Sequence, residues 1–403
     1  MTTQNLSDRT SAKTSTFTSL TDTPATYAGN AGETLKVTIA EDAVGYETIS
    51  TFSSSGSAPT IPPVNEFQSG PTQPISNFWG GGAVVLPSGK VFIVPYNYTG
   101  TQYIYNPETN ALESGGDSAP AGSSKFFGGV LLPDGRVFCA SYSYTGTQYI
   151  YNPTTGSWEN GGSPPSALFR FKTAVLMKNG KVLCVPAGNL SSVSIFNPAT
   201  NSFESGGTWP SGNASQYGGD FIGAVALPNG KVFCVPSLYT GTQYIYNPDT
   251  QNFETAATLP SVSSDFQGGC LLPNGKVFCA PYFYAGTQYI YNPDTDAWEN
   301  GGTPPSGGGN FNGAVLMNNG KVFCVPFNYS GTTYIYNPQT NAWESGGSTP
   351  SGGGRFYGGV LMPNGKVFCA PNNFNGSNYI FDPGENDSTE FGTWMNEPYW
   401  NKF

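Results

Sequence analysis

Histidine is absent from this sequence of 403 residues. Histidine is the commonest general base in enzymes and the commonest metal ligand in proteins. Its absence therefore disfavours Ser-His catalytic triads, histidine-based zinc sites and the copper sites of oxidases. We expect the protein to hold neither a metal ion nor another cofactor.

Charge is also scarce, because charged residues make up 10% of the chain and the net charge is −10. The basic residues are spread thinly, whereas nucleic-acid binding needs a clustered positive surface, so we expect no nucleic-acid partner. No apolar run approaches the ~18 residues of a membrane-spanning helix, so we expect no membrane insertion. The opening MTTQNLSDRTSAKTST lacks the apolar core of a secretory signal. We therefore expect an unprocessed protein made in the cytoplasm.

Glycine, proline and aromatic residues are abundant instead. The chain has 53 Gly and 33 Pro, and 14% of its residues are aromatic. This mixture is typical of many short strands joined by tight turns. The composition predicts an all-β fold rather than a helical one.

A turn of the form N-G-K-V-F-C recurs seven times along the chain. Successive turn glycines lie 46, 45, 50, 45, 45 and 45 residues apart. A nearly fixed period in this range indicates a repeat architecture. The seven glycines are Gly89, Gly135, Gly180, Gly230, Gly275, Gly320 and Gly365.

Each repeated unit contains four predicted strands. In the idealised unit, GAVLLP and KVFCVP flank the Asn-Gly turn, which is a strong hairpin signal. TQYIYN forms the third strand and ends at N-P-x-T, where proline blocks further pairing. A short x-W-E-S segment forms the fourth strand. Four antiparallel strands in about 45 residues correspond to one blade of a β-propeller, so the sequence predicts a seven-bladed β-propeller.

The seventh unit lacks its fourth strand after YIFDP, which spans Tyr379–Pro383. The missing segment occurs before the first unit, where Val64–Pro74 reads VNEFQSGPTQP and matches TNSFESGGTWP of Thr200–Pro210. We expect Asn65–Gly70 to be the outer strand of blade 7. This N-terminal strand would close the ring without leaving an open edge.

The unit resembles the kelch repeat. Its IYNPxTNxW segment is similar to the tyrosine, Asx-Pro and tryptophan pattern of that family. The resemblance covers residues 64–383 and implies a kelch-like propeller, although kelch has a double glycine where the second strand here has Cys, Ala or Val, and Pro. The matching segments are Tyr105-Asn106-Pro107, Tyr291-Asn292-Pro293 with Trp298, and Tyr336-Asn337-Pro338 with Trp343.

Six of the seven cysteines occupy one repeat position, where blade 1 has Ile93. The apolar replacement predicts small buried packing residues, and equivalent positions one blade apart are too distant for a disulfide. The outer-strand aromatic residues are expected to pack between blades, with the glutamate that follows each of them in solvent. These pairs are Trp158-Glu159, Phe203-Glu204, Phe253-Glu254, Trp298-Glu299 and Trp343-Glu344.

The two faces of the propeller are expected to differ. The framework face carries the uniform turns, and the opposite loop face carries the varied second-to-third loops and the loops between blades. Binding sites usually lie on loops held by a rigid scaffold, and aromatic rings with amide and hydroxyl groups suit sugars. The alternative is that the loop tyrosines only pack their own loops. The candidate ligand-binding residues are Tyr96, Tyr98, Tyr142, Tyr144, Tyr282, Tyr284, Lys125, Arg170, Lys172, Arg355 and Tyr357.

Catalytic signals are weak. No S-x-D-x-G-x-T-W box of the sialidase-type propellers occurs. Two carboxylates can hydrolyse a glycoside, but Asp220 and Asp265 are only equivalent positions of adjacent repeats. We expect the chain not to be an enzyme and assign no catalytic residue.

Residues 1–63 lack the repeat and are rich in Ser and Thr. Within them, Phe17–Thr48 resembles a module near the N-terminus of bacteriophage tail and virion fibre proteins, of the form F-x-x-L-x-D-T-P-x-x-Y-x-G-x-A-G. That resemblance implies a segment that joins the fibre to the particle, often as a homotrimer. The alternative is a flexible leader. The candidate anchor residues are Phe17, Leu20, Asp22, Pro24, Tyr27 and Gly32.

Three parts are predicted: an anchor with a linker over 1–63, the propeller over 64–383 and an aromatic tail over 384–403 that packs on the propeller or on a partner subunit. The predicted protein is a structural component of a bacteriophage virion, a tail or head fibre. It would contact other virion proteins through its N-terminal segment and attach to the host by receptor binding, through a surface glycan. The alternatives are a capsid or tail decoration or connector protein and, less favoured, a glycan-degrading enzyme.

Overall fold

The turn glycines close a hairpin in every unit. In the first unit, the Gly89 amide donates to the Leu86 carbonyl at 2.9 Å, and the Leu86 amide donates to the Lys90 carbonyl at 2.8 Å. Gly89 has a φ of +79°, a left-handed conformation that glycine adopts at little cost. The same pair of hydrogen bonds recurs in the other six units, so the predicted hairpins are confirmed.

A computed structural model describes the repeats and the segment just before them. The described residues are 65–74, 79–96, 100–120, 126–142, 147–164, 170–186, 192–210, 221–237, 242–259, 265–282, 287–305, 310–350, 354–372 and 377–384. The predicted anchor and linker lie outside them, as does the tail beyond Gly384. The three-part division of the chain therefore stays a prediction.

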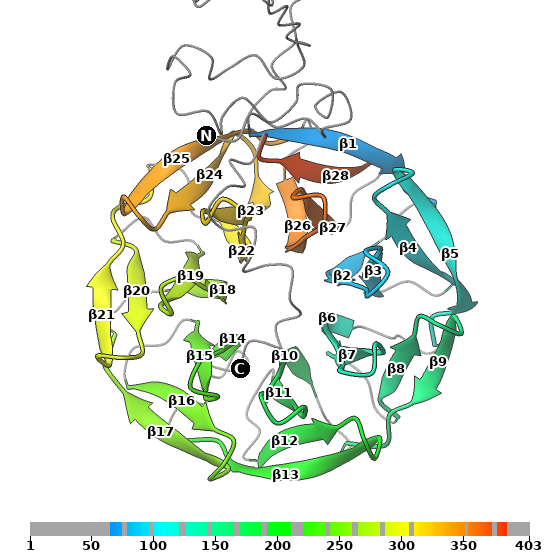
Figure 1. Ribbon diagram of the computed structural model, residues 1–403, viewed down its shortest axis with the longest axis horizontal. Helices are drawn as coiled ribbons and strands as arrows, with labels where there is room; N and C mark the ends of the chain where they lie inside the picture. Colours follow the sequence, from blue (N-terminus) through cyan, green and yellow to red (C-terminus); the bar gives the residue numbers. More distant parts are fainter. Residues whose placement is uncertain are drawn as a thin grey trace, which may run out of the picture. The chain divides into compact units, whose positions relative to one another are not determined.

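The described residues form strands and no helix, and the strands are arranged as seven antiparallel blades around a central opening (Figure 1). None of the described segments is a helix long and apolar enough to cross a membrane. This confirms the predicted all-β propeller.

Blades 1 to 6 each contain four strands that are consecutive in the chain. From the inner to the outer strand, blade 1 is β2 (Gly80–Val85), β3 (Val91–Pro95), β4 (Thr101–Asn106) and β5 (Ala111–Ser118); blade 2 is β6 (Phe126–Leu131), β7 (Val137–Ser141), β8 (Tyr149–Asn152) and β9 (Ser157–Asn160); blade 3 is β10 (Phe171–Leu176), β11 (Val182–Pro186), β12 (Ser192–Asn197) and β13 (Ser202–Thr208). Blade 4 is β14 (Phe221–Ala226), β15 (Val232–Pro236), β16 (Gln243–Asn247) and β17 (Asn252–Ala256); blade 5 is β18 (Phe266–Leu271), β19 (Val277–Pro281), β20 (Tyr289–Asn292) and β21 (Ala297–Asn300); blade 6 is β22 (Phe311–Leu316), β23 (Val322–Tyr329), β24 (Thr332–Asn337) and β25 (Ala342–Ser348).

Blade 7 combines both ends of the repeat region. Its first three strands are β26 (Gly354–Leu361), β27 (Val367–Pro371) and β28 (Ser377–Asp382), and its outer strand is β1 (Glu66–Thr72). β1 pairs antiparallel with β28, so that Phe67 lies opposite Phe381. The Phe67 ring also lies 5.9 Å from the ring of Phe356 and 6.0 Å from that of Phe323 in blade 6. The predicted closure by an N-terminal strand is therefore confirmed.

Stacked aromatic rings join adjacent blades. The second-strand Phe92 of blade 1 stacks on the third-strand Tyr151 of blade 2, with ring centroids 4.5 Å apart. Phe368 of blade 7 packs on Tyr105 of blade 1 at 5.0 Å, which joins the last blade to the first; only blade 3 has no ring at this second-strand position, where Leu183 packs in one buried cluster with Tyr246. Burying one such ring contributes about 1.5–3 kcal/mol. The equivalent pairs are Phe138–Phe196, Phe233–Tyr291, Phe278–Tyr336 and Phe323–Phe381.

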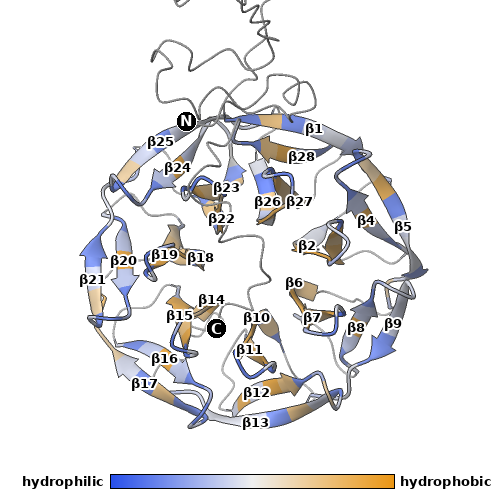
Figure 2. Ribbon diagram, viewed as in Figure 1, coloured by the Kyte–Doolittle hydropathy of each residue, from blue (hydrophilic) through white to orange (hydrophobic). Residues whose placement is uncertain are grey.

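The buried core is divided into seven clusters, and each cluster takes residues from two adjacent blades. Apolar residues gather on the inner strands, whereas the outer strands and turns are mostly polar (Figure 2). All seven cysteines are free, and the six at the repeat position are buried. Trp158 of blade 2 packs on Phe92 of blade 1. The expected packing roles of these cysteines and of the outer-strand aromatic residues are confirmed.

A buried glutamine links the second and third strands where their ladder ends. β3 and β4 pair only at Val91↔Tyr105 and Phe92↔Ile104. Beyond this point, the Gln102 side-chain amide donates to the Ile93 carbonyl at 2.7 Å and to the Tyr103 carbonyl at 3.0 Å. The amide therefore satisfies backbone acceptors that the ladder leaves unpaired. Gln148, Gln243 and Gln288 do the same in their blades.

A Lys-Glu-Asn network joins three strands of each blade at the framework face. In blade 3, Glu204 of the outer strand accepts from Lys181 at the start of the second strand and, at 2.6 Å, from the Asn197 side chain at the end of the third. The network recurs in blades 1, 4, 5 and 6 with Lys90-Glu113-Asn106, Lys231-Glu254-Asn247, Lys276-Glu299-Asn292 and Lys321-Glu344-Asn337. The expectation that these glutamates are only solvated is wrong, because strand order brings a lysine 23 residues earlier beside each of them.

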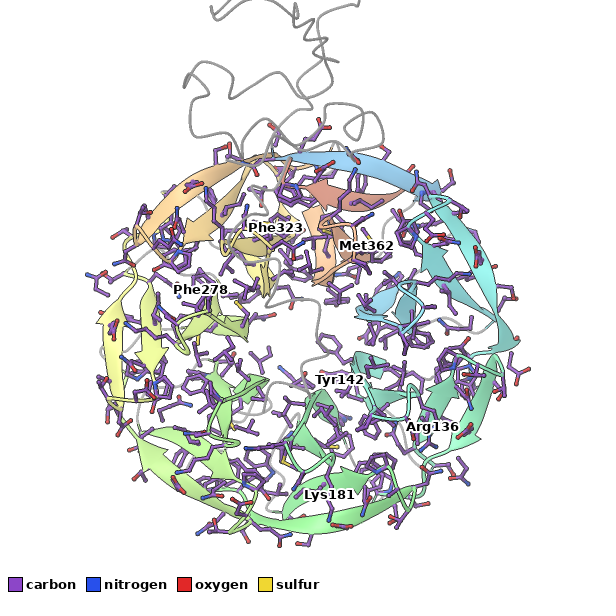
Figure 3. The ribbon with its side chains drawn as sticks, viewed as in Figure 1. Arg136, Tyr142, Lys181, Phe278, Phe323 and Met362 are labelled. Carbon is purple, nitrogen blue, oxygen red and sulfur yellow. The ribbon has the colours of Figure 1, made fainter. Side chains whose placement is uncertain are left out.

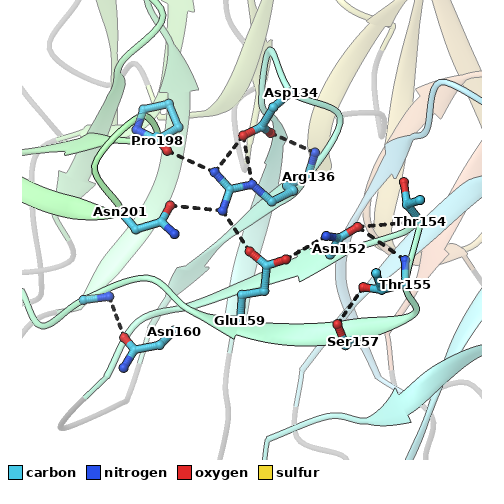
Figure 4. Close-up of polar contacts among 11 residues, drawn as sticks. Asp134, Arg136, Asn152, Thr154, Thr155, Ser157, Glu159, Asn160, Pro198 and Asn201 are labelled. Atoms are coloured by element: carbon cyan, nitrogen blue, oxygen red, sulfur yellow. Dashed lines mark hydrogen bonds and ion pairs between the residues drawn. The ribbon is translucent and has the colours of Figure 1, made fainter.

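In blade 2 an arginine takes the place of the lysine (Figure 4). Arg136 pairs with Glu159 at 2.9 Å and with Asp134 at 2.6 Å. It also reaches blade 3, where it donates to the Asn201 side chain at 3.0 Å and to the Pro198 carbonyl at 2.9 Å. The guanidinium has more donors than an ammonium group, so it joins two blades where lysine joins the strands of one.

The closing blade keeps the same network with two exchanged groups. Gln68 of β1 stands at the glutamate position, and Asp382 of β28 stands at the asparagine position. Lys366 donates to Gln68 Oε1 at 2.8 Å and pairs with Asp382 at 2.7 Å, while Gln68 Nε2 donates to Asp382 at 2.8 Å. The carboxylate and the amide have changed strands, but the charge and the hydrogen bonds of the network are retained.

We expect Phe67→Ala to destabilise the fold by about 2–3 kcal/mol, less than for a fully buried phenylalanine because Phe67 is partly exposed. The residue holds the closing strand against two blades. Urea unfolding of the purified chain measures the change. Ser69→Ala, at an exposed position of the same strand, is the matched control. Equal unfolding midpoints for the two variants would contradict the role of β1 in closing the ring.

The stability of the propeller should also depend on acid pH. Lys181 and then Asn197 hold the pKa of Glu204 below its ordinary value, and the carboxylates of blades 1, 4 and 5 are held likewise. Such groups stabilise the fold above their unfolded pKa of about 4.3 and lose this contribution as the pH falls through the lower folded pKa.

The melting temperature should therefore be nearly constant from about pH 7 to 5 and fall below about pH 4. The double variant Glu204→Gln with Glu254→Gln should show a smaller acid fall than the unchanged chain. Glu108→Gln, on the exposed turn at 107–110, should behave as the unchanged chain. If the melting temperature fell equally at acid pH in the double variant and the unchanged chain, protonation of these glutamates would not explain the loss of stability.

Candidate functional site

Backbone hydrogen bonds fix the edge of the central opening at the loop face. In blades 1, 5, 6 and 7, the amide of a residue near the end of the second strand donates to the carbonyl of a residue at the start of the first strand or just before it. These bonds join Tyr96 to Trp79, Tyr282 to Asp265, Phe327 to Asn310 and Asn372 to Arg355, at 2.8–2.9 Å. The side chains at these positions therefore come from the scaffold rather than from the tips of loops.

Neighbouring blades are also linked at this edge. Tyr282 of blade 5 pairs with Asn310 of blade 6 in an isolated bridge. β23 of blade 6 extends to pair with β26 of blade 7, with Phe327 opposite Arg355. These links hold the second-strand ends of two blades against the blades that follow them.

Seven aromatic rings form a connected group here, which we call the aromatic arc. Its members are Trp79, Tyr96, Phe127, Tyr142, Tyr282, Phe327 and Tyr357, from blades 1, 2, 5, 6 and 7. Figure 3 shows Tyr142 at the edge of the central opening, nearer to its centre than Arg136 or Lys181.

Three rings of the arc are in mutual contact. Tyr96 lies 5.7 Å from both Phe127 and Tyr357, which are 5.0 Å from each other. Trp79 stacks on Tyr96 with an interplanar angle of 12°, and Phe327 stacks on Tyr357 with one of 24°. All of these rings are partly exposed, so the arc has apolar surface available to a ligand.

Gly81 allows this contact between rings of blades 2 and 7. It occupies the repeat position that holds Phe127 in blade 2 and Tyr357 in blade 7. A Cβ atom at Gly81 would lie 1.9 Å from the Phe126 carbonyl oxygen and 3.2 Å from Tyr96 Cβ. Blade 1 therefore has no side chain at this position, and the rings of its two neighbours meet across it.

Three of the arc tyrosines, Tyr96, Tyr282 and Tyr357, keep neutral hydroxyl groups. Burial raises the pKa of Tyr357 to about 12 and raises the pKa of Tyr96 and of Tyr282 as well. Each hydroxyl can therefore donate and accept a hydrogen bond at neutral pH. The arc combines apolar ring faces with hydroxyl groups on one side of the opening.

Polar groups are described on the remaining side of the opening, in blades 3, 4 and 5. The Ser237 hydroxyl of blade 4 donates to Asp265 of blade 5 at 3.0 Å. Lys172 of blade 3 is partly buried, and burial lowers its pKa while the charge of Asp265 opposes that change. Asp265 also contributes to the raised pKa of Tyr282, after burial. The polar group thus adjoins one end of the aromatic arc.

The structure places seven of the eleven candidate binding residues. Tyr96, Tyr142, Tyr282 and Tyr357 come together in the arc, and Lys172 lies on the polar side of the opening. Arg170 and Arg355 are exposed. Arg170 directly precedes the inner strand β10 of blade 3, and Arg355 lies near the start of the inner strand β26 of blade 7. Tyr98, Tyr144, Tyr284 and Lys125 lie outside the described residues, as do the anchor candidates Phe17, Leu20, Asp22, Pro24, Tyr27 and Gly32.

Trp79, Phe127 and Phe327 were missing from the candidate residues, as were Ser237 and Asp265. A signal was available for all five, because they occupy the same repeat positions as the candidates. Phe327 and Ser237 correspond to Tyr96, Phe127 corresponds to Tyr357, and Trp79 and Asp265 correspond to Arg355. The candidate residues are all tyrosines, lysines or arginines, so the other residue types at these positions are not among them.

No metal site is formed by three or more His, Cys, Asp or Glu side chains within the described part of the chain. The arrangement at the opening is suited to non-covalent binding by ring faces, hydroxyls and a few charges.

No protein-family model matches this chain, and no curated protein sequence matches it. Solved structures do match. A virginiamycin B lyase from Staphylococcus aureus has a TM-score of 0.63 at 8% identity, over 79% of this chain and 99% of the lyase. A fungal alcohol oxidase of the AA5 family, in complex with copper, has a TM-score of 0.58 at 16% identity, over 79% of this chain and 76% of the oxidase. These likenesses support the propeller fold.

The comparison corrects the expectation that the chain is not an enzyme. Propellers with a similar backbone include a lyase and an oxidase, so the architecture gives no ground for excluding catalysis. A variant of the lyase in which alanine replaces a histidine is described as catalytically inactive. This chain has no histidine, so catalysis here would have to use other side chains.

Proposed function

We propose that this protein binds a saccharide at the aromatic arc and that, as part of a bacteriophage virion, it attaches the particle to its host through this site. The observation that carries the proposal is the convergence of seven rings from five blades at one opening. Other repeat positions keep their residue type around the ring, whereas these positions vary.

The chemistry of the arc suits a sugar. A pyranose has an apolar C–H face, which packs on aromatic rings, and hydroxyl groups around its edge. Tyr96 and Tyr357 offer both ring faces and neutral hydroxyls. Ser237, Asp265 and Lys172 add polar partners beside one end of the arc. Sites of this kind combine mostly apolar walls with a few polar groups that set orientation.

The virion part of the proposal is supported by the sequence of residues 17–48, which resembles the particle-joining module of phage fibre proteins. A decoration protein would share the anchor but would not need a saccharide site.

Tyr96→Ala should weaken saccharide binding by about 30-fold, the effect of truncating a central aromatic contact worth about 2 kcal/mol. Tyr96→Phe, which keeps the ring, should lose much less. Binding of the full-length protein to host-surface polysaccharide is measured by calorimetry, with the melting temperature of each variant recorded and reducing ends assayed to detect turnover.

Equal affinity of Tyr96→Ala, Tyr357→Ala and the unchanged protein, with unaltered melting, would show that the arc is not the binding site. The absence of any saccharide binding would favour a decoration role. Release of reducing ends would identify the bound sugar as a substrate.

Deletion of residues 1–63 should abolish incorporation into particles and leave a folded propeller, because the deletion ends before β1. Incorporation is measured by immunoblotting of purified particles, and folding by the melting transition. A deletion to residue 72, which removes β1 as well, is the comparison and should fail to fold. Incorporation of the protein that lacks residues 1–63 into particles would contradict the anchor assignment.

A further inference from the structure

The basic residues of the two faces differ in their partners. Each blade has one basic residue in its framework-face network, and all seven pair with a carboxylate. Arg170, Lys172 and Arg355 are the basic residues described at the loop face, and none of them forms an ion pair there with another described residue. Of the four described cations without an ion pair, three therefore lie at the opening, and the fourth, Lys178, lies on the exposed framework-face turn of blade 3.

These cations lie next to the aromatic arc. The backbone of Arg355 pairs with that of Phe327, a member of the arc, and Tyr357 follows two residues later. Lys172 occupies the same repeat position as Phe127 and Tyr357, so its side chain belongs to the same ring of positions at the opening. Arg170 precedes Lys172 by two residues, as Arg355 precedes Tyr357.

One carboxylate is described at the opening, that of Asp265, and it accepts a hydrogen bond from Ser237 at 3.0 Å. Asp265 and Lys172 interact through their charges but are not within ion-pair distance. Holding an ammonium group partly buried without a contacting carboxylate costs free energy. A ligand that brings a negative charge to this position would recover that cost.

We infer that the saccharide bound at the aromatic arc carries an anionic group, a carboxylate or a phosphate, which Lys172 and one of the two arginines contact while the sugar ring packs on the arc. This inference rests on the proposed saccharide binding and adds the class of sugar. A planar guanidinium and an ammonium group both bind carboxylate and phosphate oxygens, and hydrogen bonds between charged partners are stronger than neutral ones.

The arginines and Lys172 should contribute unequally to the affinity for an anionic saccharide. Arg170 and Arg355 are exposed, so salt screens their interactions and each adds little alone. Lys172 is partly buried, so its contact with an anion should be stronger and less sensitive to salt. Replacing Lys172 should therefore cost more affinity than replacing Arg355.

The test uses the full-length protein and three polymers: a uronate-containing polysaccharide, the same polysaccharide with its carboxyl groups reduced to alcohols, and a glycosylated polyol-phosphate polymer. Affinities are measured by calorimetry at 50 and 500 mM NaCl for the unchanged protein, Lys172→Met and Arg355→Gln. Lys178→Gln is the matched control, because Lys178 is exposed on the turn that joins β10 and β11 at the framework face.

We expect at least about a tenfold preference for one anionic polymer over the carboxyl-reduced one, corresponding to about 1.4 kcal/mol. Lys172→Met should remove most of this preference, Arg355→Gln a part of it, and Lys178→Gln none. Preference for the uronate or for the phosphate polymer identifies the anion.

Equal binding of the anionic and reduced polymers, unchanged in Lys172→Met, would overturn the anionic assignment while leaving saccharide binding in place. Binding of none of the three polymers would overturn both the anionic assignment and the proposed function for this class of sugar. If Lys178→Gln weakened binding as much as Lys172→Met, the effect would be one of overall charge and the assignment of Lys172 would be wrong.

Discussion

The stacking of a second-strand ring on the third-strand ring of the next blade is the interaction on which the structure depends. It joins six of the seven neighbouring pairs of blades, from Phe92–Tyr151 to Phe368–Tyr105. Between blades 3 and 4, Leu183 takes the place of the second-strand ring and lies in the same buried cluster as Tyr246. Because every blade packs on an equivalent neighbour, the residues that make this contact repeat almost unchanged. The ring also has to close, and β1 achieves this by completing blade 7 with a strand from the other end of the repeats. The conserved packing leaves the loop-face positions free to differ from blade to blade.

Much of the fold could be predicted from the sequence because the units are similar enough to show where one of them lacks a strand. The missing fourth strand of the last unit and the spare strand before the first identified the closure by Asn65–Gly70, which the structure places in β1. The pairing of Glu204 with Lys181 could not be read in the same way, because the partners are 23 residues apart and meet only through the order of strands in the blade. The role of Gln102 also depends on where the ladder between β3 and β4 ends.

The proximity of some candidate residues could be predicted from the sequence, and their role in binding stays a prediction. Variation at equivalent positions pointed to Tyr96, Tyr142, Tyr282, Tyr357 and Lys172, and the structure brings the four tyrosines together in one arc. The phenylalanines and Trp79 were not selected, because an apolar ring in a sequence is ordinarily a core residue. Contact across blade 1 required Gly81, whose effect is visible only when the distance to the neighbouring backbone is known.

Together these features describe a scaffold with one uniform face and one specialised face. On the framework face, seven cations are neutralised by carboxylates; at the opening, rings, hydroxyls and cations without ion pairs are presented together. The most direct test of this account is a structure of the full-length protein with a host-surface saccharide. We predict that a sugar ring packs on Tyr96 and Tyr357, with Lys172 beside it. A saccharide bound at the framework face, or along the outer strands, would contradict the account.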